Sequence, residues 1–388
     1  MRLYLATFVV TAVVTFALTW VVWRISLRYK LHPEVRERDV HKTPTPRLGG
    51  VGMFLGATAV ILTSSQIPFF SIFWEHPEPI WAILSATAII VVVGVADDLW
   101  DLDWLLKLGA QFLAAGIVVW FGGVQLYYLP VGGQTVLPQA ALVAISVLAI
   151  VVVMNAVNFI DGLDGLVAGV ALIANGVFFA YTYLLVRDFG ASSYSNLASF
   201  LAVVLLGVCA GFLPLNWNPA KIFMGDSGAL MIGLLMACST IAITGQLSPA
   251  LLSDNDVFGR SQLLGAFIPI LLPIVVVLLP LLDFGMAVIR RMSRGKSPFS
   301  PDRQHLHHRM LDMGHSDRDA VLIFYSWTSV VSLSVLLMYI GTTASWPGDY
   351  LLGLAFLVVG VAACLVVTFI PARPARAAAS VSEREPRR

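Results

Sequence analysis

Residues 80–109 read IWAILSATAIIVVVGVADDLWDLDWLLKLG, and this stretch decides the fold class. An apolar run of about 20 residues is long enough to cross the hydrocarbon core of a bilayer as a helix. This run ends in the four aspartates Asp97, Asp98, Asp101 and Asp103, and a second apolar run follows at once. We therefore expect two membrane-spanning helices joined by an acidic turn.

Apolar runs of this kind recur along the whole chain. Of its 388 residues 58% are hydrophobic and 12% are charged, with a mean hydropathy of +0.84, whereas a soluble domain has about 25% charged residues. We predict an all-α polytopic integral membrane protein, with one domain over residues 1–370 and a disordered cytoplasmic tail over 371–388. Eleven spans are expected, at 3–23, 48–65, 80–96, 104–122, 139–157, 165–186, 196–215, 229–246, 264–289, 320–340 and 350–370.

The basic residues predict the orientation, because cytoplasmic loops carry an excess of Lys and Arg. With the N-terminus outside, the inward-facing segments hold 20 of the 24 Lys and Arg residues: seven in 24–47, one at Lys221, seven in 290–318 and five in 373–388. We therefore expect an outside N-terminus and a cytoplasmic C-terminus.

This orientation places four polar segments on the cytoplasmic face. They are residues 96–101, 158–165, 218–228 and 305–309, and they join consecutive pairs of spans from the third to the tenth. Carboxylates, amides, cations and histidines at one mouth of a helical bundle suit metal-dependent phosphate chemistry. The sequence therefore predicts an active site at the cytoplasmic face.

Asp97 and Asp98 lie at the C-terminal end of the third span, where the helix dipole opposes negative charge. A divalent cation, or a proton on one carboxylate, would relieve their repulsion. Lys107 opens the next span, where a charge in an apolar helix is costly. It either snorkels to the interface or contacts a phosphate, and we favour the phosphate.

Asn158, Asp161 and Asp164 follow one another at steps of three residues. This spacing would place their oxygens on one helical face, although a simple turn is the alternative for the last of them. Oxygen ligands suit Mg²⁺, which takes few protein ligands and completes its shell with substrate phosphates. Asp226 is the natural ligand in the next segment, and Phe223 is either a nucleobase platform or an interfacial anchor.

His305, His307 and His308 form a cluster next to Arg303 and Arg309. A zinc site is disfavoured because no cysteine lies in any predicted cytoplasmic loop. A lipid-headgroup patch would need only Lys and Arg. We therefore interpret this segment as a phosphate-binding loop.

The order and spacing of these segments resemble the polyprenyl-phosphate N-acetylhexosamine-1-phosphate transferase family, glycosyltransferase family 4. VHKTPTPRLGG at 40–50 and SPFSPDRQHLHH at 297–308 are similar to the branch that uses N-acetylglucosamine with undecaprenyl or decaprenyl phosphate. The resemblance implies a multi-pass protein of the bacterial cytoplasmic membrane. It also implies transfer of N-acetylglucosamine 1-phosphate from UDP-N-acetylglucosamine to the lipid with release of UMP, the first lipid-linked step of a cell-wall or surface polysaccharide pathway.

The resemblance also implies a role for each candidate residue. Asp226 and Asn158 would hold Mg²⁺, with Mn²⁺ as a substitute. The catalytic group would be Asp97, Asp98, Asp161 and Lys107. The substrates would be bound by Phe223, Asn218, Asp164, Arg303, His305, His307, His308, Lys42 and Arg47. Of these, Phe223 and Asn218 would line the uridine pocket, with Asp164 near it. Either Asp97 or Asp98 would act as a base, or a phospho-aspartate would form. A homodimer is compatible with the resemblance, and no nucleic-acid partner is expected.

Two alternatives remain open. The donor could be another UDP-N-acetylhexosamine. An ion-coupled transporter also has intramembrane acids and broken helices. Carrier sites, however, lie near the bilayer midplane between repeated halves, whereas these polar residues gather at one boundary and no repeat is visible.

Overall fold

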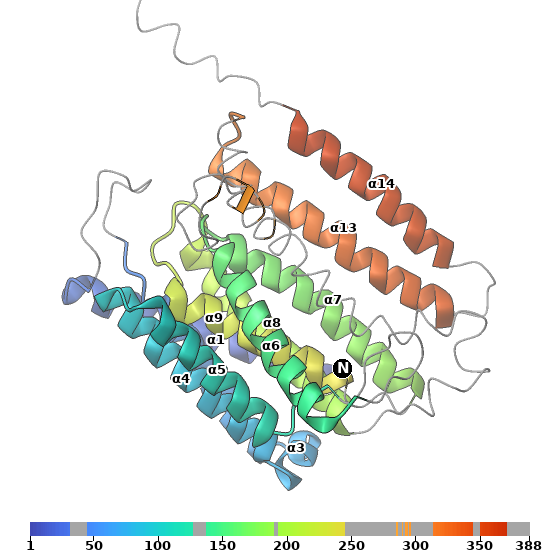
Figure 1. The fold of residues 1–388 in the computed structure, drawn as a ribbon, viewed down its shortest axis with the longest axis horizontal. Coiled ribbons are helices and arrows are strands. Elements are labelled where there is room, and N and C mark those ends of the chain that lie inside the picture. Colours follow the sequence, from blue (N-terminus) through green and yellow to red (C-terminus); the bar gives the residue numbers. More distant parts are fainter. Residues whose placement is uncertain are drawn as a thin grey trace, which may run out of the picture.

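The computed structural model describes residues 1–31, 45–126, 137–189, 193–244, 313–343 and 350–370, together with Gly285, Ile289, Met292, Ser293 and Gly295. All regular structure within these residues is helical, and they contain no strand (Figure 1). The predicted all-α class is confirmed.

Eight helices in the described part of the chain are long and apolar enough to cross a membrane. They are α1 (Arg2–Arg28), α4 (Glu78–Trp100), α6 (Gln139–Phe159), α7 (Leu166–Phe189), α8 (Ser193–Asn216), α9 (Gly225–Thr244), α13 (Asp317–Thr343) and α14 (Tyr350–Phe369). Each coincides with a predicted span, so the protein is a polytopic membrane protein.

Two further predicted spans form shorter helices. The first, α2 (Gly49–Thr63), runs through the 3-10 turns η1 (Ser64–Gln66) and η2 (Pro68–Phe70) into α3 (Ser71–Glu75), with a bend of 98°. The second, α5 (Trp104–Trp120), has 17 residues. The predicted span 264–289 lies almost entirely outside the described residues, as does the tail 371–388. The total of eleven spans and the orientation therefore stay predictions.

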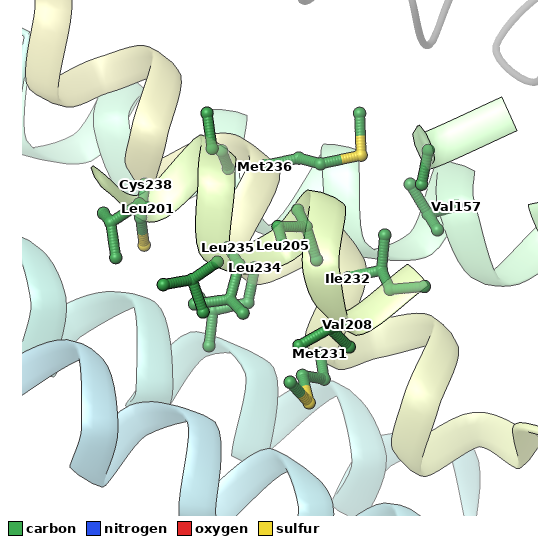
Figure 2. Close-up of a cluster of buried hydrophobic side chains, with 14 of the residues drawn as sticks. Val157, Leu201, Leu205, Val208, Met231, Ile232, Leu234, Leu235, Met236 and Cys238 are labelled. Atoms are coloured by element: carbon green, nitrogen blue, oxygen red, sulfur yellow. The ribbon is translucent and has the colours of Figure 1, made fainter. Parts of the chain in front are cut away.

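Helix α9 forms the centre of the bundle and contacts α2, α4, α6, α7 and α8. Its apolar side chains belong to one buried cluster with those of α6 and α8, and Figure 2 shows Val157 of α6, Leu205 of α8 and Met231 of α9 within it. Close approach between membrane helices depends on small residues. A Cβ atom at Gly233 of α9 would lie 2.6 Å from Cα of Met154 in α6, so only glycine permits this spacing.

The connections α4–α5, α6–α7 and α8–α9 meet at one end of the bundle, which brings three of the four polar segments together. The opposite end holds the start of α1, where Tyr4 contacts Phe69 and Phe70. Helices α13 and α14 lie side by side along one edge of the bundle, away from α4 and α5 (Figure 1). The fold therefore gathers the candidate site at the end that the sequence predicts to be cytoplasmic.

Candidate active site

Asp98, near the end of α4, caps the first turn of α9. Its Oδ1 accepts a hydrogen bond from the backbone N–H of Asp226 at 3.3 Å, and its Oδ2 accepts one from Ser227 Oγ at 3.5 Å. Gly225 precedes them with a φ of +68°, and its missing side chain leaves room for this carboxylate. The first N–H groups of a helix have no partner within the helix, and the Asp98 carboxyl supplies an acceptor for one of them. Asp98 thus joins α4 to α9.

Lys107, in the first turn of α5, lies between two carboxylates. Its Nζ is 2.9 Å from Oδ2 of Asp97 and 3.3 Å from Oδ2 of Asp226. The other oxygen of Asp97 accepts a hydrogen bond from the backbone N–H of Leu102 at 2.9 Å. The exposed fractions of the Lys107, Asp97 and Asp226 side chains are 26%, 10% and 27%, so a ligand can reach this group. The ammonium of Lys107 therefore compensates the negative charge of Asp97, which the dipole of α4 disfavours at this end of the helix.

The turn after α6 does not follow the predicted helical face. The prediction is wrong because α6 ends at Phe159, and the chain turns through residues 160–165 before α7 begins. Asp161 instead lies within electrostatic range of Asp226 and Arg47. Asp164 is buried and accepts hydrogen bonds from the loop that precedes α9. The two acids therefore serve different parts of the site.

Asp161 has the most perturbed environment of the turn. Burial of its carboxyl raises the pKa to about 7, and the negative charge of Asp226 acts in the same direction, while Arg47 opposes it. Within the described part of the chain, no group donates a hydrogen bond to the Asp161 carboxyl or bonds to the Asn158 side chain. Asp161 thus remains available to a ligand within electrostatic range of Asp226, and the Asn158 side chain has no bond to a described residue that would compete with a ligand.

The side chains of this site offer the type of ligand atom that Mg²⁺ prefers, which is oxygen. Asp226, Asp161 and Asn158 offer only oxygens, and Mg²⁺ is commonly held by one or two carboxylates plus substrate phosphates. Among the described residues no group of three or more His, Cys, Asp or Glu side chains is arranged to hold a metal ion. An ion bound by these side chains would share its coordination with a phosphate of the substrate. The assignment of Asp226 and Asn158 as ligands stays a prediction.

The segment before α2 is paired with the loop that leads into α9. The N–H of Phe223 donates to the carbonyl of Pro46 at 2.8 Å, and the N–H of Gly49 donates to the carbonyl of Phe223 at 2.9 Å. This pairing positions exposed Arg47 next to the acidic group, within electrostatic range of Asp98 and Asp161. Two sequence segments about 175 residues apart thus supply a cation and a partly exposed aromatic ring to one site.

The second half of the site is built on Asp164. Its Oδ2 accepts hydrogen bonds from the backbone N–H of Ala220 at 3.0 Å and from Nδ2 of Asn218 at 3.2 Å. Asn216 bridges the same two loops, because its Oδ1 accepts from the N–H of Gly165 and its Nδ2 donates to the carbonyl of Ile222, both at 3.0 Å. The structure therefore brings Asn218 and Asp164 together, as the resemblance implies.

Two residues of α13 also hold these loops, and sequence reasoning missed them. Arg318 donates from Nε to Oδ1 of Asn218 at 3.3 Å and from Nη2 to its backbone carbonyl at 2.9 Å. Tyr325 donates from its hydroxyl to the carbonyl of Gly165 at 2.6 Å. The signal in the sequence is their spacing of seven, which places them on one face of a helix.

The other predicted substrate-binding residues lie outside the described part of the chain. They are Lys42, Arg303, His305, His307 and His308. Their contribution to phosphate binding stays a prediction.

Comparison with known proteins adds an independent finding. A family model described as Glycosyl transferase family 4 matches residues 80–244. The decaprenyl-phosphate N-acetylglucosaminephosphotransferase of Mycobacterium tuberculosis is 41% identical over 83% of this chain and 79% of its own. The protein of the same name from Mycolicibacterium smegmatis is 37% identical over 93% and 86%. A probable undecaprenyl-phosphate N-acetylglucosaminyl 1-phosphate transferase of Bacillus subtilis is 28% identical over 85% and 84%.

Proposed function

The chain belongs to glycosyl transferase family 4, and we propose that it transfers N-acetylglucosamine 1-phosphate from UDP-N-acetylglucosamine to a decaprenyl or undecaprenyl phosphate. The products are UMP and polyprenyl-diphospho-N-acetylglucosamine, the first lipid-linked intermediate of a cell-wall or surface polysaccharide. The observation that carries this proposal is the position of Lys107 between Asp97 and Asp226, at the end of a membrane bundle. The names of the relatives support the sugar and the lipid.

We place this site at the cytoplasmic face of the bacterial membrane. The distribution of Lys and Arg supports that orientation. One substrate is a water-soluble nucleotide sugar and the other has a long hydrocarbon tail, so both meet only at a membrane interface. A homodimer is part of the same proposal.

In the reaction, an oxygen of the lipid phosphate attacks the β-phosphorus of the nucleotide sugar. A bond forms between these two atoms, and the bond from the β-phosphorus to the bridging oxygen breaks, which releases UMP. Phosphoryl transfer depends mainly on positioning and on stabilisation of charge. Lys107 and Arg47 would supply fixed positive charge to the diphosphate. Bound Mg²⁺, held by Asp226 and Asn158, would neutralise phosphate oxygens.

Asp161 is the residue that we assign to accept the proton of the lipid phosphate. Its pKa of about 7 suits a base that works near neutral pH. Asp97 and Asp98, the bases expected from the resemblance, already accept hydrogen bonds from Lys107 and from backbone amides. Both carboxylates are therefore engaged in joining α4 to α5 and to α9, whereas no described residue donates a hydrogen bond to the Asp161 carboxyl.

Release of UMP by the purified full-length protein tests the proposal. The assay contains UDP-N-acetylglucosamine, decaprenyl phosphate and Mg²⁺ in detergent, with EDTA and Asp226→Ala as controls. We expect release that requires the lipid and the metal ion. No release with several UDP-sugars and prenyl phosphates, from protein shown to be folded, would overturn the proposal and favour a transporter. Comparing UDP-N-acetylglucosamine with other UDP-N-acetylhexosamines in this assay tests the identity of the sugar.

A further inference from the structure

The side-chain amide of Asn218 is held from both sides by groups that can bond it in only one orientation. Its Oδ1 accepts from Arg318 Nε at 3.3 Å, and its Nδ2 donates to Asp164 Oδ2 at 3.2 Å. A guanidinium has only donors, whereas an ionised carboxylate has only acceptors. Rotating the amide by 180° would point its oxygen at the carboxylate and its N–H groups at the guanidinium. Both contacts would then become repulsive.

Each partner is itself fixed in place. Arg318 also donates from Nη2 to the backbone carbonyl of Asn218 at 2.9 Å. Asp164 is buried, and its Oδ2 also accepts from the N–H of Ala220 at 3.0 Å. The orientation of the amide is therefore set by two elements, the start of α13 and the turn after α6, rather than by Asn218 alone.

The fixed amide still has capacity for a ligand. A carboxamide has two N–H groups and two acceptor lone pairs on its oxygen, and the two side-chain contacts use one of each. A remaining N–H donor beside a remaining acceptor matches the edge of uracil, which presents the O4 acceptor next to the N3–H donor. Cytosine presents the reverse pattern, an N4 amino donor next to the N3 acceptor. A flipped Asn218 would match cytosine instead.

We propose that Arg318 is a specificity-determining residue that makes the site select uracil over cytosine nucleotides by fixing the orientation of the Asn218 amide. This inference rests on the proposed function, since it assumes that Asn218 contacts the nucleobase of the sugar donor. Arg318 acts through Asn218 and is a positioning residue, not a catalytic one.

A second contact of α13 provides a control that distinguishes orienting the Asn218 amide from merely anchoring the helix. Tyr325 bonds the carbonyl of Gly165 at 2.6 Å, seven residues beyond Arg318, and no hydrogen bond joins it to Asn218. Tyr325→Phe therefore weakens the attachment of α13 to the site without changing the groups that face the amide. It is the matched control for Arg318→Met, which keeps the apolar stem and removes every donor.

The test is equilibrium binding of UMP and of CMP to the full-length protein in detergent with Mg²⁺. We expect the wild type to prefer UMP, and the ratio of the two dissociation constants to fall about tenfold to 100-fold in Arg318→Met, the equivalent of one hydrogen bond to a charged group. Arg318→Lys, which keeps a donor-only cation, should retain most of the preference. Tyr325→Phe should keep the wild-type ratio even if its thermal stability falls.

Arg318→Gln provides a second variant if Arg318→Met does not fold, because an amide at this position both donates and accepts and so permits either orientation. An unchanged ratio in folded Arg318→Met or Arg318→Gln would overturn the inference. So would an equal loss in Tyr325→Phe. Failure of the proposed function looks different, because wild-type protein would then neither bind UMP nor release it from UDP-N-acetylglucosamine.

Discussion

Replacing Gly94 with alanine should separate the helices that carry the acidic site. Gly94 lies on α4, one turn before Asp98, where this helix crosses the first turn of α9. A Cβ atom added there would lie 2.5 Å from the backbone N of Ser227, whereas ordinary contacts begin at 3.4 Å. Backbone atoms cannot rotate away, so the two helices must move apart by about 1 Å because a close-packed interior offers no void to absorb the methyl group.

The expected losses follow from that displacement. Overpacking of this kind costs about 1–3 kcal/mol of stability. The movement also shifts Asp97 relative to Asp226, and the ammonium of Lys107 can no longer lie 2.9 Å and 3.3 Å from the two carboxylates at once. Misplacing a catalytic group by about 1 Å can cost about 100-fold in rate. We therefore expect UMP release to fall about 100-fold while most of the protein stays folded at 25 °C.

The measurements are UMP release and thermal unfolding of Gly94→Ala in detergent. Gly116→Ala is the matched control, because a Cβ atom at Gly116 in α5 meets nothing within 4 Å. The control should keep wild-type activity and gain about 0.4–1 kcal/mol from the lower entropy of its unfolded chain. Wild-type activity in Gly94→Ala would refute the contact between α4 and α9 on which the description of the site depends.

Three further predictions address individual side chains. Lys107→Met should lower UMP release about 100-fold to 1,000-fold, because it removes a fixed charge from the transition state; release within threefold of wild type would exclude this lysine from catalysis. Asp161→Asn should raise the thermal stability of metal-free protein more at pH 8 than at pH 5. The folded-state pKa of about 7 lies above the ordinary 3.8, so wild-type stability falls as pH rises between these values, and a pH-independent difference would contradict that pKa. Gln111→Leu should cost about 1–3 kcal/mol, because Oδ1 of Asn155 loses its partner across the α5–α6 contact while Nδ2 keeps only the carbonyl of Val151. Replacing both residues by Leu should recover most of that loss in thermal unfolding, and additive losses would show that the pair is not coupled.

Periodicity and charge predict the helices of this protein well, because a helix in a bilayer must be long and apolar whatever it packs against. Residues 80–96 were predicted as a span from composition alone, and α4 extends this range to Trp100. The extension has a tertiary cause. Asp97 and Asp98 remain helical because Lys107 and the first turn of α9 compensate their charge. No window of the sequence contains those partners.

The site shows the same division between local and tertiary information. The aspartates and Lys107 could be predicted as site residues from the sequence, because an ionisable side chain in an apolar helix costs free energy and is usually functional. Their pairing could not, since Asp226 is 119 residues from the lysine that it contacts. The spacing of Asn158, Asp161 and Asp164 suggests a helical face, but α6 ends at Phe159. The Asp-Gly pairs at 161–162 and 164–165 are the local turn signals that the spacing argument outweighed. Arg318 was counted only as an inward-facing charge, although it bonds Asn218.

The position of α9 links the stability of the bundle to the chemistry of the site. Its body is buried against α2, α4, α6, α7 and α8, so its first turn cannot shift without repacking the centre of the protein. That first turn carries Asp226, and it donates to Asp98 from the N–H of Asp226 and from the hydroxyl of Ser227. Because Asp98 is bound in this way, the two acids have different roles. Asp98 fixes the position of α4 against α9, while Asp97 binds Lys107. Exchanging Asp98 for Asn should therefore lower thermal stability as well as activity, whereas Asp97→Asn should mainly affect activity.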